Sequence, residues 1–134
     1  MTNPEALLRR VLWSCNREVY ADAAAFDAAI RKYYRDLDVD LERWRGDDLV
    51  LAAPRVHVQF MCWENDDQVE PRLLLEASDP AGFTALDLLS QTHNAVARYL
   101  REHDATLGDH RFFEGLSAAA GDREVPLYFV DFGS

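Results

Sequence analysis

The sequence predicts an α+β fold, in which a mostly antiparallel sheet of four to five strands carries one long helix on one face. Two observations support this prediction. The stretch from about 84 to 103 repeats its apolar residues with a helical period behind an N-terminal cap. Two pairs of stretches alternate apolar and polar residues with a period of two, and each pair is joined by a short polar loop. The chain 1–134, with 49% hydrophobic residues, is expected to form a single domain around one core.

The first 37 residues predict helical structure. Asn3 is a suitable N-cap, Pro4 fits the first helical position, and Glu5 places an acid in the first turn. Apolar residues then recur in helical phase without glycine or proline between them: Leu8, Leu12, Cys15, Val19, Ala23, Phe26, Ile30, Tyr33 and Leu37. Asp22 can cap a second helix, so we predict two helices, with one continuous helix as the alternative. They would cover the other face of the sheet or one of its ends.

Residues 36–48 lead from these helices to the sheet. Between Asp36 and Glu42 acidic and apolar residues alternate with a period of two, which indicates that the helix has ended. The acids are not expected to form a calcium loop, because Leu41 stands where such a loop requires glycine. Residues 44–48 are typical of a turn.

The next segment predicts an antiparallel strand pair. A short apolar run over 49–53 precedes residues 55–63, in which Val56, Val58, Phe60 and Cys62 share one face and His57, Gln59, Met61 and Trp63 the other. Polar residues 64–68 supply the turn, and residues 69–77 return as the second strand. Pro71 has no amide hydrogen to donate, so the start of that strand is expected at an edge or a bulge.

The helix of about 84–103 is the best-defined element. Thr84 and Asp87 match a capping box, in which the hydroxyl accepts from the amide three residues on and the carboxylate reaches back to the cap amide. One broad arc collects Ala85, Leu86, Leu89, Thr92, His93, Val96, Ala97, Tyr99, Leu100 and His103. The opposite arc is polar, so the helix is expected to lie on the sheet with one side in water.

A second hairpin closes the chain. Residues 111–120 and 125–132 predict its strands, and residues 121–124 its loop. Gly115 is expected at a bulge. Both alternating sets of the last strand are apolar, which predicts cover on both of its faces: Leu127 and Phe129 on one, and Tyr128, Val130 and Phe132 on the other.

The charge balance excludes some partners and favours others. There are 14 Lys and Arg residues against 24 Asp and Glu, and the net charge of −10 repels phosphate backbones and anionic lipids. We therefore expect no nucleic-acid and no membrane partner, and a basic protein as the partner instead. In the alternative, the acidic residues only keep the protein soluble and do not bind a partner.

Other features predict an intracellular, cytoplasmic protein. No stretch approaches the roughly 18 apolar residues of a membrane helix. The apolar run 11–13 is too short for a signal peptide. Cys15 and Cys62 lie on predicted apolar faces without C-x-x-C spacing, so we expect reduced core thiols in place of a disulfide or a metal site.

The sequence lacks the signatures of phosphate-binding loops, dinucleotide sites, nucleophile elbows and zinc proteases, which disfavours an enzyme without excluding one. No cofactor and no metal are predicted. His57, His110 and Glu114 are the residues that an enzyme or ligand-binding domain would use, since an imidazole beside carboxylates suffices for acid–base work. His93 lies within the apolar arc of its helix and is expected to be a structural histidine bonded to a backbone carbonyl.

Aromatic and acidic residues together suggest a recognition surface. Met61 and Trp63 lie opposite the predicted core and are followed by acids, a combination common at protein interfaces. The candidate partner-binding residues are Trp44, Met61, Trp63, Glu64, Asp66 and Asp67. In the alternative, the N-terminal helices simply bury Met61 and Trp63.

We therefore expect a non-enzymatic, intracellular protein-binding module whose acidic surface steers and masks a basic partner. Bacterial immunity proteins and acidic secretion chaperones are similar in size and charge, although no motif of either is matched residue by residue. The alternative is a small enzyme or ligand-binding domain that uses His57, His110 and Glu114. The sequence defines neither the partner nor the oligomeric state, and a homodimer remains open.

Overall fold

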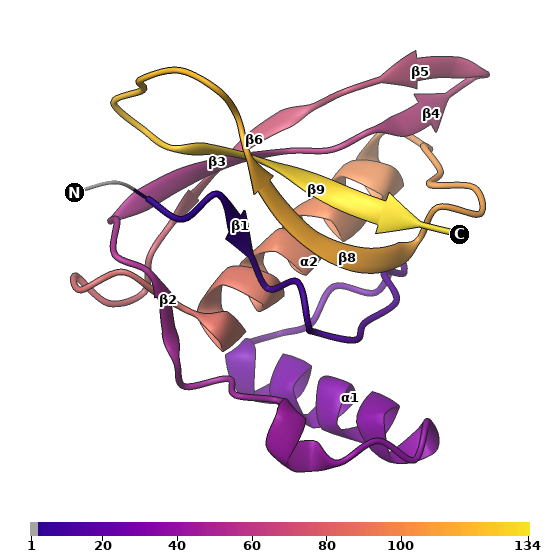
Figure 1. Cartoon of the computed structure of the whole chain (residues 1–134). Coiled ribbons are helices and arrows are strands. Elements are labelled where there is room, and N and C mark those ends of the chain that lie inside the picture. The colour runs from indigo at the N-terminus through magenta and orange to yellow at the C-terminus, as the bar shows by residue number, and fades with distance from the viewer. Residues whose placement is uncertain (1–2) are drawn as a thin grey trace.

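The computed structural model describes residues 3–134. Its elements are, in chain order, β1 (Ala6–Leu7), α1 (Ala23–Asp36), the 3-10 helix η1 (Leu41–Arg43), β2 (Leu49–Leu51), β3 (Arg55–Gln59), β4 (Cys62–Glu64), β5 (Asp67–Val69), β6 (Arg72–Glu76), β7 (Phe83–Thr84), α2 (Ala85–Glu102), β8 (Phe112–Ala118) and β9 (Leu127–Gly133). Figure 1 shows three layers: the sheet, α2 against one of its faces, and α1 on the far side of α2.

The fold is α+β, as predicted, and its main sheet is a mixed one of five strands. The strand order is β1-β8-β9-β3-β6. The neighbours β3 and β9 are parallel, and the other three neighbouring pairs are antiparallel. A helical crossover joins strands that run in the same direction, and α2 accordingly connects β6 to β8, which is parallel to it. Because β9 runs antiparallel to β8, and β3 antiparallel to β6, β9 lies parallel to β3. Two small ladders, β2 with β7 and β4 with β5, lie outside this sheet.

α2 confirms the predicted helix. The Thr84 hydroxyl accepts a 3.0 Å bond from the Asp87 amide, and His103 is the C-cap. Only half of the capping box forms, because the Asp87 carboxylate accepts from the amide and hydroxyl of Ser78 at 2.9 and 2.8 Å. The helix is buried over a wide arc: Ala85, Leu88, Leu89, Ser90, Thr92, His93, Val96, Ala97 and Leu100.

The prediction of two N-terminal helices is wrong for the first and right for the second. Asp22 caps α1 by accepting from the Ala25 amide at 2.8 Å. Residues 3–22 contain no helix, so Asn3 does not cap one. α1 also fails to cover the second face of the sheet, because it packs on α2 instead.

The first helix does not form because the edge of β8 pairs with its backbone. Backbone bonds of 2.8–2.9 Å tie Glu5, Trp13 and Cys15 to residues 111–118. Sheet pairing thus satisfies groups that a helix would satisfy internally. Trp13 and Cys15 are both buried, with the period of two that a strand produces.

The predicted strand pairs form, but the long first pair is divided. The stretch 55–63 breaks after Gln59 into β3 and β4, and its return breaks at Pro71 into β5 and the edge strand β6. In the second hairpin the register shifts at Gly115, the predicted bulge. Gly115 has a φ of +115°, and a Cβ there would lie 2.9 Å from the Leu7 carbonyl oxygen, so a side chain is excluded.

The outer face of the sheet, away from α2, carries no helix in the described part of the chain (Figure 1). The predicted cover on both faces of the last strand therefore holds only in part. Leu127 is 3% exposed, whereas Phe129, two residues along the same face, is 39% exposed.

Candidate functional site

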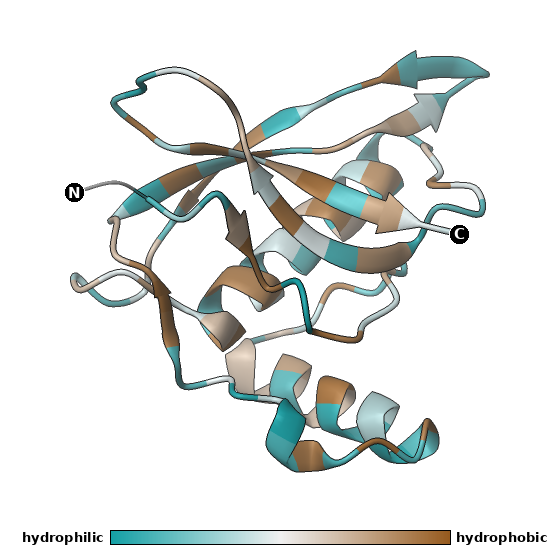
Figure 2. Cartoon of the chain, in the orientation of Figure 1, coloured by the Kyte–Doolittle hydropathy of each residue, from teal (hydrophilic) through white to brown (hydrophobic). Residues whose placement is uncertain are grey.

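The β4–β5 hairpin projects beyond the main sheet and carries most of the predicted partner-binding residues (Figure 1). Asn65 and Asp66 in its turn have φ values of +49° and +70°. Two consecutive left-handed residues are what a type I′ hairpin turn requires. The tip is hydrophilic (Figure 2), and it exposes Asp66 and Asp67 to solvent.

Trp63 joins this hairpin to the loop that follows α2. Its amide donates to the Thr106 carbonyl at 2.9 Å, and its carbonyl accepts from the Thr106 amide at 3.0 Å. The indole lies 6.1 Å from the ring of His110, with 32° between the planes. Because the ring is only partly buried, it forms a fixed aromatic surface that a partner can reach.

An open pocket of about 510 Å³ lies beside this ring, and we name it the Trp63 pocket. It is lined by Trp63, Asp66, Thr106, Gly108, Asp109 and His110. Within residues 3–134 neither Asp66 nor Asp109 forms an ion pair. Aromatic rings beside free carboxylates suit a Lys or Arg side chain, through cation–π contact and charge-assisted hydrogen bonds.

Glu64, by contrast, is already engaged by the end of α2. Its carboxylate accepts from the Tyr99 hydroxyl at 3.3 Å and lies 3.2 Å from Nδ1 of His103. The rings of Tyr99 and His103 stack with centroids 4.0 Å apart. Burial, and to a lesser extent the Glu64 carboxylate, raises the pKa of Tyr99, which keeps the phenol protonated as a donor. Glu64 therefore fixes the hairpin to α2.

Trp44 does not belong to this surface, which corrects the sequence-based assignment. The residue is 4% exposed, and its Nε1 donates to the Asp27 carboxylate at 2.8 Å. Its turn lies against α1, so the indole fills the core. Met61 is partly exposed, whereas its neighbour Cys62 is buried.

The three residues of the enzyme alternative are not brought together. His57 pairs with Leu127 at the start of β9. Glu114 lies at the bulge near the other end of that strand, with its carboxylate against Gly133. The two ends are roughly 20 Å apart at the usual rise of a strand. His110 lies against Trp63, so the three side chains form no acid–base cluster.

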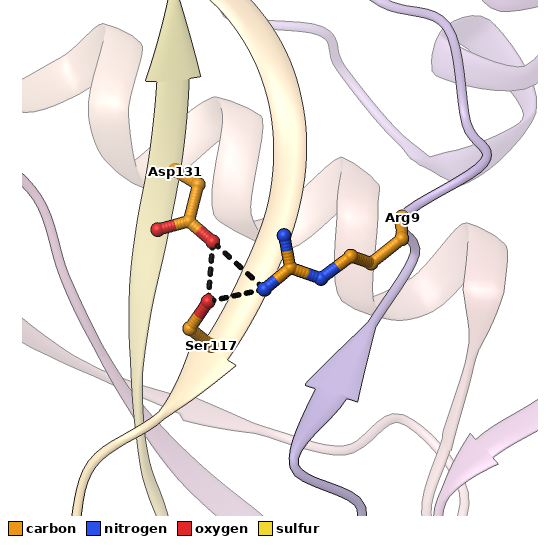
Figure 3. Close-up of polar contacts among 3 residues, drawn as sticks. All are labelled: Arg9, Ser117 and Asp131. Carbon is orange, nitrogen blue, oxygen red and sulfur yellow. Dashed lines mark hydrogen bonds and ion pairs between the residues drawn. The ribbon is translucent and has the colours of Figure 1, made fainter.

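Sequence reasoning missed a polar cluster on the outer face of the sheet, formed by Arg9, Ser117 and Asp131 (Figure 3). Arg9 donates to the Ser117 hydroxyl at 2.7 Å and lies 3.5 Å from the Asp131 carboxylate, which accepts from the same hydroxyl. The cluster holds no imidazole that would activate Ser117 as a nucleophile. It ties the N-terminal segment to β8 and β9, and no local sequence signal marks residues that meet only through strand pairing.

His93 lies in the core, as expected. Its Nδ1 accepts from the Trp13 indole at 3.1 Å, which leaves Nε2 to donate to the Glu18 carbonyl at 2.8 Å. The side chain is fully buried, and burial lowers the pKa of the ring, which keeps it neutral. Both nitrogens have partners, so the arrangement is that of a structural histidine.

Comparisons with protein-family models, curated proteins and solved structures find no match for this chain. No helix within residues 3–134 is long and apolar enough to cross a membrane. Between residues 3 and 134 no group of three or more His, Cys, Asp or Glu residues is placed to hold a metal ion. The Trp63 pocket brings together two of the residues predicted for the partner surface, Trp63 and Asp66, with Asp109 and His110.

Proposed function

We propose that the chain is a non-enzymatic, intracellular protein-binding module that masks a basic segment of a partner protein, in the manner of an immunity protein or a secretion chaperone. The observation that carries this proposal is the Trp63 pocket. Its two rings and the free carboxylates of Asp66 and Asp109 receive one Lys or Arg side chain of the partner. Met61 and Asp67 extend the contact along the hairpin.

The acidity of the chain supports a division of labour at this surface. The net charge of −10 and the exposed Asp66 and Asp67 attract a basic protein before contact, which raises the association rate. The Trp63 indole acts after contact, because aromatic side chains that become buried at the centre of an interface hold complexes together.

The two cysteines fit a cytoplasmic protein. Cys15 and Cys62 are free and buried. Burial raises the pKa of the Cys15 thiol to about 12. Burial and the Glu64 carboxylate raise the pKa of Cys62 to about 11. Thiols in this state act as small apolar core groups, which suits a reducing compartment.

The proposal is tested by affinity capture with the wild-type chain and with Trp63→Ala as bait, followed by binding kinetics on the captured protein. We expect a basic partner that Trp63→Ala releases about ten to a hundred times faster. Asp66→Asn together with Asp109→Asn should mainly slow association at low salt, and rising salt should slow association of the wild-type chain.

Phe129→Ala is the matched control, because Phe129 is an exposed aromatic residue on the sheet, away from the hairpin. It should leave both rate constants unchanged. An acidic partner, an association rate indifferent to salt, or an equal loss from Phe129→Ala would contradict the proposal.

A further inference from the structure

The edge strand β6 offers an unused row of backbone groups. β6 ends the main sheet, and within residues 3–134 its only strand partner is β3. The Phe60 amide donates to the Pro71 carbonyl at 3.2 Å, and the Ala77 amide donates to the Pro54 carbonyl at 2.8 Å. Antiparallel strands bond through alternate residues, so residues 71, 73, 75 and 77 turn their backbone groups toward β3.

Arg72, Leu74 and Glu76 therefore turn their amides and carbonyls away from the sheet. The Gln91 side chain shows this direction, because it donates to the Glu76 carbonyl from α2 at 2.8 Å. An open groove of about 560 Å³ lies along this edge between β6 and α2. Leu74 is 48% exposed at its rim.

We propose that two copies of the chain pair antiparallel through β6, about a two-fold axis at Leu74. Leu74 then faces the partner's Leu74, and Arg72 faces the partner's Glu76. Each facing pair exchanges two backbone hydrogen bonds, because all of these residues point their amides and carbonyls outward. The Glu76 carbonyl keeps its bond to Gln91, since a carbonyl oxygen has a second lone pair. The two five-stranded sheets become one.

The side chains of β6 are complementary to themselves in this register. On the outer face a guanidinium lies opposite a carboxylate on both sides of the central leucine pair, and directly opposed opposite charges stabilise strand pairing. On the inner face Leu73 lies opposite the partner's Leu75, beside the groove. A slip by two residues would place Arg72 or Glu76 opposite Leu74 and lose both charge pairs. Charges on an edge strand usually prevent such pairing. In β6 the opposite charges of Arg72 and Glu76 instead favour this one register.

The pairing is isologous, the form that closes a dimer without leaving a free copy of the edge. It does not depend on the function proposed for the Trp63 pocket, which lies on the β4–β5 hairpin and not on β6. A dimer would present two such pockets to a partner.

Crosslinking tests the two-fold axis directly. In a hydrogen-bonded antiparallel pair the facing Cα atoms are about 5.5 Å apart, within the range of a disulfide. Leu74→Cys treated with copper phenanthroline should therefore give a covalent dimer at micromolar concentration. The buried Cys15 and Cys62 should not react. Phe129→Cys, exposed on the same face but two strands from the edge, should remain monomeric on the gel. Equal crosslinking of the two variants would overturn the proposal.

Charge reversal tests the register by sedimentation velocity over a range of concentrations. Arg72→Glu and Glu76→Arg should each raise the dimer dissociation constant about tenfold or more, because each places like charges opposite one another. The variant with both reversals should return to within about threefold of the wild-type value. Arg123→Glu, on the exposed β8–β9 loop, is the control with the same change in charge and should have little effect.

The direction of the change in dimer affinity distinguishes this proposal from general repulsion between acidic chains. Glu76→Arg makes the chain less acidic, so repulsion alone would strengthen its dimer, whereas the proposed pairing predicts a weaker one. Thermal unfolding of each variant confirms that the fold persists. A wild-type chain that stays monomeric at millimolar concentration, or a double reversal that fails to restore association, would overturn the proposal.

Discussion

The N-terminal segment, residues 3–22, and helix α2 have similar spacings of apolar residues, yet only α2 is helical. α2 begins at a side-chain cap and is buried on the flank that faces the sheet and on the flank that faces α1. The N-terminal segment lies beside the open edge of β8, which offers its backbone other partners. A helical period thus predicts a helix only where no sheet edge competes for the same amides.

The two regions also differ in where their stabilising contacts originate. α2 bonds its own backbone, whereas the N-terminal segment is held by the backbone of β8 and by side chains of α2. Asn94 accepts from the Tyr20 amide at 2.9 Å and donates to the Tyr20 carbonyl at 3.0 Å, as a neighbouring strand would. His93 bonds the Trp13 indole and the Glu18 carbonyl. Loss of one α2 side chain is therefore expected to loosen the part of the segment that lies beside α2 while α2 remains folded.

The largest effect is expected from leucine truncation. Leu89→Ala in α2 should lower the free energy of unfolding by about 2–5 kcal/mol, because the side chain is fully buried. Leu12→Ala, at the matching place in the N-terminal pattern, should cost about 1 kcal/mol or less, because Leu12 is only partly buried. Chemical denaturation measures both values. Equal losses would mean that the two regions are packed alike.

A smaller effect is expected from the histidine that joins the two regions. His93→Gln should lower the free energy of unfolding by about 1–3 kcal/mol, since a buried donor or acceptor is left without its partner. Hydrogen exchange should show faster opening at Trp13 to Tyr20 than in α2. His57→Gln, on the outer face of β3, serves as the control and should be nearly neutral. Uniform loss of protection in both regions would contradict a local role.

The features that the sequence predicted correctly are those with local signals. Thr84 and Asp22 cap the helices assigned to them, Gly115 lies at its bulge, and the polar residues after Trp63 form a tight turn. Each of these is a preference of a few adjacent residues for one backbone conformation. Nearby sequence is therefore enough to find them.

The features that the sequence did not predict depend on distant pairing. Asn3-Pro4-Glu5 has the chemistry of a helix start, but the edge of β8 is supplied by residues more than a hundred positions away. Trp44 is of a residue type that is common at interfaces, and only its hydrogen bond to Asp27 shows that it is a core residue. The sequence placed Trp63 and Asp66 on one hairpin, but it gave no sign that Asp109 and His110 approach them through the Thr106 bridge.

Substitution of the caps should sharpen the comparison further. Thr84→Ala should lower the free energy of unfolding by about 1 kcal/mol, because the Asp87 amide loses its acceptor. Asn3→Ala should change it by less than about 0.5 kcal/mol, because Asn3 caps no helix. Thermal or urea unfolding resolves the difference. A loss at Asn3 equal to that at Thr84 would restore the first predicted helix.

The smallest effect is expected from mild acid, and it should again act where the two regions meet. Burial lowers the pKa of His93 below its ordinary value of 6.5, so the folded protein holds the ring neutral while the unfolded chain takes up a proton. The free energy of unfolding is therefore highest above pH 6.5. It falls as the pH drops below that value, and it levels off below the pKa of His93 in the folded protein. Protonation would also remove the acceptor of the Trp13 indole.

Urea unfolding at pH 8 and pH 5.5 should show this decline in the wild-type chain, and a smaller one in His93→Gln, in which all other titrating groups are unchanged. Identical declines in the two proteins would assign the acid sensitivity to other groups and would mean that folding does not lower the pKa of His93.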